Sequence, residues 1–531
     1  MNERTVPFDP ARTTVPRMAF GTLLSRITGL FRLFALTYAL GINHVSDAYN
    51  LANNTPNIIY DLVLGGIFSA TLIPIFVEAL HGNGRQSSKE LNKDAISAIV
   101  TVSVVILIAA SLLTIIFAPW IIDLYTVGSG GPQLLAVRQV SILLLRCFAP
   151  QIAFYGFCSL ISAILNSRSI FSPPMYVPII NNLICIVMLG FVSIQFKNPS
   201  IGFTKSHLSF ELILGLGTTL GVFAQFAFLL PYMKKINLKL KWVWQPHHPV
   251  VRRVITLSSW TVGFVIANQV TYFLILALAV HSGRGGVTAY SNAFSFFQLP
   301  YGVAVVSIMS AVQPQMALSW TQHNTAMFKA RLISGLRAIN TVVIPATVML
   351  LVLSQPLIAL LLGHGSANAQ ETIPISGSLT MFALGLPGFC WYLYIVRAFQ
   401  TMQDTKSVFW LYVLENAINA ILALAFVGPW GVEGLALSMS LAYSLSAIVG
   451  YVQLSIPLDG LDLTRITSSF VRVFTMTSLA GVLSFTVEEL IGHQSGIGLL
   501  FKVVVTGLVA IVVMALTTWV GLVKALNSSQ R

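Results

Sequence analysis

The chain has 531 residues, of which 56% are hydrophobic and only 9% are charged. Soluble domains carry about a quarter charged residues, so this composition excludes an ordinary soluble domain. The formal net charge of +13 does not indicate a nucleic-acid binder, because the cations stand in short loops between apolar runs. Apolar runs long enough to cross a bilayer recur from end to end, which predicts an all-α polytopic membrane protein.

In chain order, residues 1–16 are polar and interrupted by prolines, and we interpret them as a cytoplasmic tail rather than a signal peptide. Fourteen candidate transmembrane helices follow. Their predicted limits are 17–42, 48–80, 95–125, 134–166, 172–195, 209–233, 254–281, 287–320, 330–362, 373–402, 407–427, 432–456, 466–487 and 497–523.

Two stretches of the chain place the same residue types at matching positions. Pro150 and Tyr155 recur as Pro387 and Tyr392, at an offset of 237 residues. Tyr49, Ser69, Ala70 and Pro74 recur as Tyr290, Ser310, Ala311 and Pro314, at offsets of 240 to 241 residues. Such internal repeats are typical of transporters built from two related helical bundles around a central site.

The repeat predicts two six-helix, pseudo-symmetric lobes plus two C-terminal helices. The N-lobe covers 17–233 and the C-lobe 254–456, with a basic cytoplasmic linker at 234–253 between them. The last two helices cover 466–523, and residues 524–531 form a cytoplasmic tail. Because six spans are an even number, both lobes should have the same orientation in the membrane.

Loop charges predict that both termini are cytoplasmic. The cation-rich loops alternate with loops that hold only Lys197, Lys205 and Arg284. In the linker, KKINLKLKWVWQ alternates cations with apolar residues. It could lie on the anionic inner leaflet, or it could be an orientation signal and a solvated connection.

Arg26 and Arg32 are the best candidates for residues that bind an anionic ligand. They lie six residues apart in the first span, at different depths and on the flanks of one broad face. Guanidinium groups bind phosphate or diphosphate bidentately, so the pair could hold an anionic headgroup. The alternative is an internal ion pair with Asp47 or Asp61, or snorkelling of Arg26.

Asp61 and Arg146 are among the other charged residues predicted at membrane depth. Asp61, next to Tyr60, could neutralise the arginines until substrate enters, or it could be a structural counter-ion. Arg146, one turn before Pro150, could contact substrate or cap carbonyl groups that a kink exposes.

Glu415, Asn416 and Asn419 form a polar cluster in the eleventh span. A carboxylate with amide oxygens can coordinate Na⁺ or take a proton, although helix-to-helix hydrogen bonding is the commoner use of such groups. We see no nucleotide-binding loop and no set of residues with metal-ligand spacing, so we expect neither an enzyme nor a bound metal cofactor. The four cysteines lie in apolar runs at unrelated spacings and predict no disulfide.

The sequence resembles the MurJ/MviN family of lipid II flippases, within the multidrug, oligosaccharidyl-lipid and polysaccharide exporter superfamily. The motifs that carry the resemblance are SRITGLFR at 25–32, SDAYN at 46–50, PNIIYDL from 56, AILNSRSIFSPP at 163–174, QLPYGV at 298–303, GLR at 335–337 and RAFQTMQDTK at 397–406. Members with Tyr60-Asp61 in place of an arginine pair are what we expect among actinobacterial relatives. The eighth span, SNAFSFFQ, also lacks the family's arginine.

This resemblance implies a carrier of undecaprenyl-pyrophosphate-linked disaccharide-pentapeptide, with no cofactor, in the bacterial cytoplasmic membrane. It implies alternating access through a cavity between the lobes, a lipid-tail groove at the last two helices, and work alongside other cell-wall synthesis proteins. Arg26 and Arg32 match the family's essential cations, and Asp47 matches the acidic residue that opens the second span. Two alternatives remain: a drug/cation antiporter of the same superfold, or a flippase for another polyprenyl-pyrophosphate-linked glycan.

Overall fold

The computed structural model describes residues 10–65, 86–127, 131–168, 170–236, 240–492, 496, 498–509 and 511–512. Throughout these residues the regular elements are helices, as the all-α prediction requires. The described residues up to Gln269 form one compact unit, and those from Val270 onward form a second. The lobe limits drawn from the sequence place the division earlier, in the linker, and stay a prediction.

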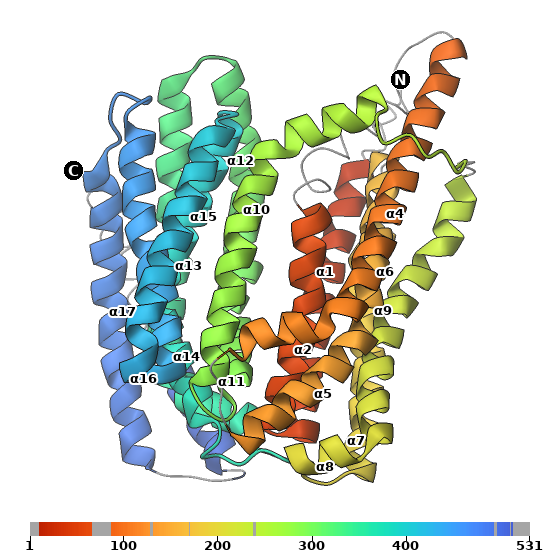
Figure 1. The fold of residues 1–531 in the computed structure, drawn as a ribbon. Helices are drawn as coiled ribbons and strands as arrows, with labels where there is room; N and C mark the ends of the chain where they lie inside the picture. The colour runs from red at the N-terminus through yellow and green to blue at the C-terminus, as the bar shows by residue number, and fades with distance from the viewer. Residues whose placement is uncertain are drawn as a thin grey trace, which may run out of the picture. The chain divides into compact units, whose positions relative to one another are not determined.

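The first unit is built from long apolar helices (Figure 1). Its elements are α1 (Pro10–Leu40), α2 (His44–Tyr60), the π-helix η1 (Asp61–Gly65), α4 (Gln86–Tyr125), α5 (Pro132–Phe148), α6 (Pro150–Ser167), α7 (Ser172–Gln195), α8 (Ile201–Ser206), α9 (Leu208–Ile236) and the first part of α10 (Pro249–His281). Helix α1 packs along α7, α7 along α9, α2 against α5, and α4 against α5 and α6.

The second unit repeats the order of helices and helix breaks found in the first unit. It holds the end of α10, then α11 (Gly286–Pro300), the π-helix η3 (Tyr301–Val305), α12 (Val306–Thr321), α13 (Thr325–Leu362), α14 (Ile373–Leu384), α15 (Leu386–Thr401), α16 (Thr405–Ser455) and α17 (Leu463–Ile491). Helix α11 packs against α14, and α13 against α14 and α15, as α2 does against α5 and α4 against α5 and α6.

The helix breaks also repeat. The π-helices begin at Asp61 and Tyr301, 240 residues apart, and each directly follows a helix that contains or ends in proline. The breaks between α5 and α6 and between α14 and α15 precede Pro150 and Pro387. The internal repeat found in the sequence is therefore accompanied by π-helices and helix breaks at equivalent positions of the two units. Its further markers Ser69, Ala70 and Pro74 lie outside the described residues.

The described residues contain ten helices long and apolar enough to cross a membrane, or up to eleven if the pair α14 and α15, bent by 52°, is one span. The predicted spans 407–427 and 432–456 correspond to the two helical parts of α16, which a kink with non-helical backbone angles separates at Gly431 (φ 55°, ψ −135°). Parts of the second and fourteenth predicted spans lie outside the described residues. A multi-pass membrane fold is thus confirmed, while the number fourteen stays a prediction.

Candidate functional site

Close packing on α7 fixes the rotation of α1. Asn182 on α7 donates through Nδ2 to the Ser25 carbonyl oxygen (3.3 Å) and to Thr28 Oγ1 (3.0 Å). One turn earlier, a Cβ at Gly21 would lie only 3.4 Å from Met175 and Tyr176, so a small residue lets the helices approach. Polar and small residues together therefore set which face of α1 meets α7.

Arg32 lies two turns after Ser25, so it is on the same side of α1. Its guanidinium hydrogen-bonds Tyr49 of α2 and interacts electrostatically with Tyr155 of α6. The Tyr49 ring is 1% exposed and stacks edge-on against Phe148, with centroids 5.5 Å apart, while its hydroxyl lies 2.9 Å from Thr218 Oγ1. A rigid aromatic wall thus positions the Arg32 guanidinium.

Arg26 has a different setting. Its side chain is partly exposed, and its Nε is buried without a hydrogen-bond partner among the described residues. Within that part of the chain, neither Arg26 nor Arg32 forms an ion pair with a carboxylate. Of the alternatives set out from the sequence, an ion pair of either arginine with Asp47 or Asp61 is not found among the described residues, and Asp61 accepts from Gln269 instead.

Tyr60 and Asp61 stand where α2 passes into η1. The Tyr60 hydroxyl lies 2.6 Å from Ser159 Oγ on α6, and Gln269 of α10 donates through Nε2 to Asp61 Oδ2 at 2.8 Å. A π-helical turn shifts the side-chain direction, and such turns are frequent at functional sites. Here the turn gives the Asp61 carboxylate a neutral amide as its partner.

Asp47 and Arg146 lie at a helix start and a helix end. Asp47 is buried in the first turn of α2, after the Asn43 N-cap, where a negative charge suits the positive end of the helix dipole. Arg146 is exposed in the last turn of α5. Among the described residues, no hydrogen bond or ion pair joins Arg146 to a neighbour, and no carbonyl is capped by it.

A second polar group lies in the second unit, on α16. Glu415 is 1% exposed, and its Oε2 is buried without a hydrogen-bond partner among the described residues. Asn416 donates to the Tyr412 carbonyl oxygen at 2.8 Å, and Ser438 Oγ donates to Asn419 Oδ1 at 3.0 Å. All three residues of the predicted cluster are therefore buried, and one oxygen of the Glu415 carboxylate has no hydrogen-bond partner among the described residues.

Tyrosines surround Glu415, and the sequence reading of this site did not include them. Tyr290, Tyr392, Tyr412 and Tyr443, from α11, α15 and α16, all interact with it electrostatically. The Tyr392 ring stacks edge-on against Tyr412 and Tyr443, at 5.7 and 5.2 Å between centroids, and its hydroxyl is buried without a described partner. The repeat pairs Tyr49 with Tyr290 and Tyr155 with Tyr392, and this signal could have located them.

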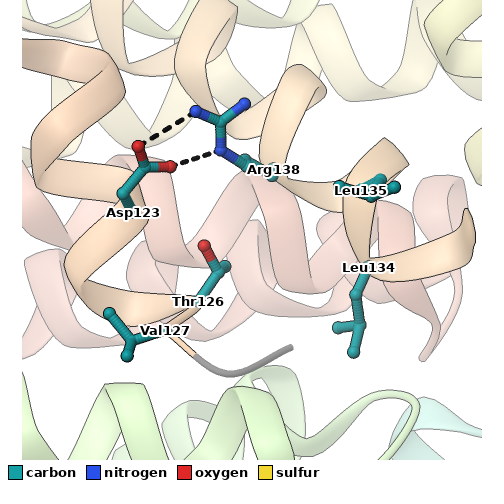
Figure 2. A pocket seen from close by; sticks show the side chains of 6 residues that line it. All are labelled: Asp123, Thr126, Val127, Leu134, Leu135 and Arg138. Atoms are coloured by element: carbon teal, nitrogen blue, oxygen red, sulfur yellow. Dashed lines mark hydrogen bonds and ion pairs between the residues drawn. The ribbon is translucent and has the colours of Figure 1, made fainter. Parts of the chain in front are cut away.

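Two further charged residues were missed. Figure 2 shows Asp123 at the end of α4, paired with Arg138 of α5 beside a cavity of about 280 Å³. Arg138 contacts Asp123 through Nε and donates from Nη2 to Asp123 Oδ2 at 3.0 Å. Because the two charges pair with each other, we assign a structural role to this ion pair rather than a role in binding substrate. The described residues hold no cluster of three or more metal-ligating His, Cys, Asp or Glu side chains.

Comparison with known proteins gives one consistent result. A family model described as "Lipid II flippase MurJ" matches residues 36–506, a range that begins after Arg26 and Arg32. The lipid II flippase MurJ of Burkholderia cenocepacia is 26% identical over 437 residues, covering 82% of this chain and 81% of the relative. A probable lipid II flippase MurJ of Rhizobium tropici is 26% identical over 500 residues, covering 93% and 90%.

Solved structures agree on the fold. A lipid II flippase MurJ in an inward closed conformation superposes with a TM-score of 0.77 and 22% identity, covering 96% of this chain and 99% of that one. An inward-facing multidrug transporter of the MATE family gives a TM-score of 0.64 at 12% identity, covering 83% and 98%. At these identities the likeness concerns the fold alone.

Proposed function

The chain belongs to the lipid II flippase MurJ family, and we propose that it carries lipid II from the inner to the outer leaflet of the bacterial inner membrane by alternating access. Lipid II is the lipid-linked precursor of peptidoglycan, so this activity serves cell-wall synthesis. We place both termini in the cytoplasm, on the strength of the loop charges. The drug/cation antiporter alternative is not favoured, because the family model and the two curated relatives described above are named as lipid II flippases.

Arg26 and Arg32 bind the diphosphate of the substrate in this proposal. The observation that carries it is the absence, among the described residues, of any carboxylate paired with either guanidinium. A cation kept at membrane depth without a counter-ion is costly, and a ligand anion offsets that cost. The Tyr49 hydroxyl orients Arg32, so its fork of N–H donors is held ready for two phosphate oxygens.

The neighbouring polar groups extend the same surface for the sugar and peptide parts of the headgroup. Tyr60 and Asp61 present a hydroxyl and a carboxylate that are already oriented by Ser159 and Gln269. Asp47 and Arg146 stay in the proposal with lesser roles, at the start of α2 and at the end of α5. In this proposal the lipid tail remains in the bilayer, next to the C-terminal helices.

A cation drives the return step in this scheme. The unused Glu415 oxygen, the Asn419 side-chain oxygen and the surrounding tyrosine hydroxyls fit Na⁺ or a proton, because a buried carboxylate without a cationic neighbour needs one or the other. When bound, that cation supplies positive charge to Glu415. The membrane potential, negative inside, also favours outward movement of an anion, by about 2.3 kcal/mol per charge per 100 mV.

Complementation of a strain depleted of its own flippase tests this function. The wild-type gene should restore growth and exposure of lipid II at the outer leaflet, while Arg26→Ala and Arg32→Ala should restore neither, at equal amounts of protein in the membrane. Arg284→Ala, which alters an exposed arginine that pairs with Glu371 outside the motifs and the proposed site, is the matched control and should complement fully. Full transport by both Arg26→Ala and Arg32→Ala would remove the binding site proposed here.

A further inference from the structure

An extended segment between α9 and α10, residues 240–245, is fixed across the surface of α4 (Figure 1). We refer to these residues as the strap. The Lys241 N–H donates to Ser97 Oγ at 3.2 Å, and the Val243 N–H donates to Thr101 Oγ1 at 3.1 Å. Two residues of extended chain advance about 6.6 Å, and four residues of helix about 6 Å, so the spacings match.

The alternation of an extended chain gives the strap two faces. Val243 turns toward the protein and packs on the apolar cluster that contains Ile96 and Ile99 of α4. Trp242 and Trp244 take the other face and are 69% and 54% exposed. Two large aromatic side chains are therefore held outward by a backbone that is bonded to a helix.

The strap lies at the depth of a membrane interface. The apolar span of α4 begins at Ile96, and the strap is bonded to Ser97 and Thr101, within the first turns of that span. The ten residues of α4 before it, QSSKELNKDA, include four charged ones. Tryptophan is enriched at this level of membrane proteins, because its ring is apolar and its N–H can reach water or headgroups.

Cations flank the strap on both sides. Lys234 and Lys235 end α9, Lys241 is in the strap, and Arg252 stands in the first turn of α10, and all four are exposed. The sequence from 232 to 252 contains no acidic residue. An exposed patch of cations and tryptophans at interfacial depth is complementary to anionic phospholipid.

We propose that the strap is an interfacial anchor, in which Trp242 and Trp244 enter the headgroup region while Lys234, Lys235 and Lys241 bind anionic phospholipid of the same leaflet. This anchor holds the first unit at a fixed depth through α4. The anchor uses none of the residues proposed to bind lipid II, so it can be tested independently of the proposed transport function.

Tryptophan quenching in nanodiscs tests the depth. The full chain is reconstituted in phosphatidylglycerol brominated either near the headgroup or near the chain ends, and compared with the variant Trp242→Phe/Trp244→Phe. The fluorescence lost in the variant should be quenched by the shallow bromines and little by the deep ones or by aqueous acrylamide. Trp120→Phe is a matched control, because Trp120 is equally exposed, at 69%, near the far end of α4.

Binding of anionic lipid tests the charge. Phosphatidylglycerol should raise the melting temperature of the detergent-purified wild type more than phosphatidylcholine does. The variant Lys234→Gln/Lys235→Gln/Lys241→Gln should need more phosphatidylglycerol for the same effect, by about fivefold per lysine removed. Lys406→Gln, an exposed lysine at the start of α16, should behave as wild type.

Acrylamide quenching of the Trp242 and Trp244 component, with no quenching by either lipid, would overturn the proposal and indicate a surface for a soluble protein partner. Equal responses of the triple-lysine variant and the wild type to phosphatidylglycerol would overturn it as well. Both sets of substitutions alter exposed side chains and leave the backbone hydrogen bonds to Ser97 and Thr101 in place, so folding should be retained.

Discussion

Tyr155 in α6 and Tyr392 in α15 occupy equivalent positions of the internal repeat, 237 residues apart, yet Tyr155 interacts with a cation, Arg32, and Tyr392 with a carboxylate, Glu415. The preceding tyrosines of the repeat, Tyr49 and Tyr290, follow the same division. The two units thus share equivalent tyrosines but place opposite charges beside them, Arg32 in the first unit and Glu415 in the second. The tyrosine site of the first unit therefore suits an anionic ligand, and that of the second unit suits a cation.

The Tyr49 hydroxyl should matter for transport because it holds Arg32. Tyr49→Phe keeps the ring against Phe148 but removes the hydrogen bonds to Arg32 and Thr218. We expect lipid II transport to fall about fivefold, the equivalent of one hydrogen bond of about 1 kcal/mol, with unchanged protein level. Tyr394→Phe is the control, because among the described residues that buried hydroxyl donates to Met316 Sδ and the Arg331 carbonyl oxygen and to no arginine side chain. Equal rates for both variants would contradict this role of Tyr49.

Arg32→Lys separates charge from shape. Lysine keeps the positive charge but loses the planar fork of donors that fits a diphosphate. We expect transport well below wild type and above that of Arg32→Ala, measured as exposure of lipid II at the outer leaflet. A lysine variant as active as the wild type would mean that only the charge is used at this position.

Glu415→Gln should abolish a cation-dependent gain in stability. If the cluster binds Na⁺, the melting temperature of the wild type should rise with NaCl relative to choline chloride, by RT ln(1 + [Na⁺]/Kd) in free energy. The glutamine variant should show no such difference. Glu433→Gln, on the same helix but in a more exposed position, should keep it. A sodium response retained in Glu415→Gln would exclude this site for Na⁺.

Gly385, at the break between α14 and α15, lets α16 approach closely. A Cβ there would collide with the backbone and side chain of Ser440 on α16, whose Oγ donates to the Met381 carbonyl oxygen at 2.7 Å. Gly385→Ala should therefore destabilise the protein by about 1–3 kcal/mol, as overpacking does. Gly428→Ala adds a Cβ into open space within α16 and should be neutral or slightly stabilising. Thermal unfolding in detergent compares the two, and an unchanged melting temperature for Gly385→Ala would contradict the packing argument.

The polar cluster of the second unit shows how far sequence reasoning reached. The spacing of Glu415 and Asn419 placed both on one helix face, and both are buried there. Two of their tyrosine neighbours lie on α16 itself, but Tyr290 and Tyr392 come from α11 and α15, more than a hundred and about twenty residues away in the sequence. Spacing rules act within one helix, so they could not indicate the contacts from α11 and α15.

The sequence by itself determined the membrane class, the helical elements and the internal repeat. Hydropathy and the positions of prolines are local properties, which can be read from neighbouring residues. Only the tertiary structure decided that Arg32 turns to Tyr49, that Asp61 takes Gln269 as its partner, and that one Glu415 oxygen has no described partner. These outcomes depend on how each helix is rotated about its axis. That rotation is set by contacts such as Asn182 with Ser25, which join residues far apart in the chain.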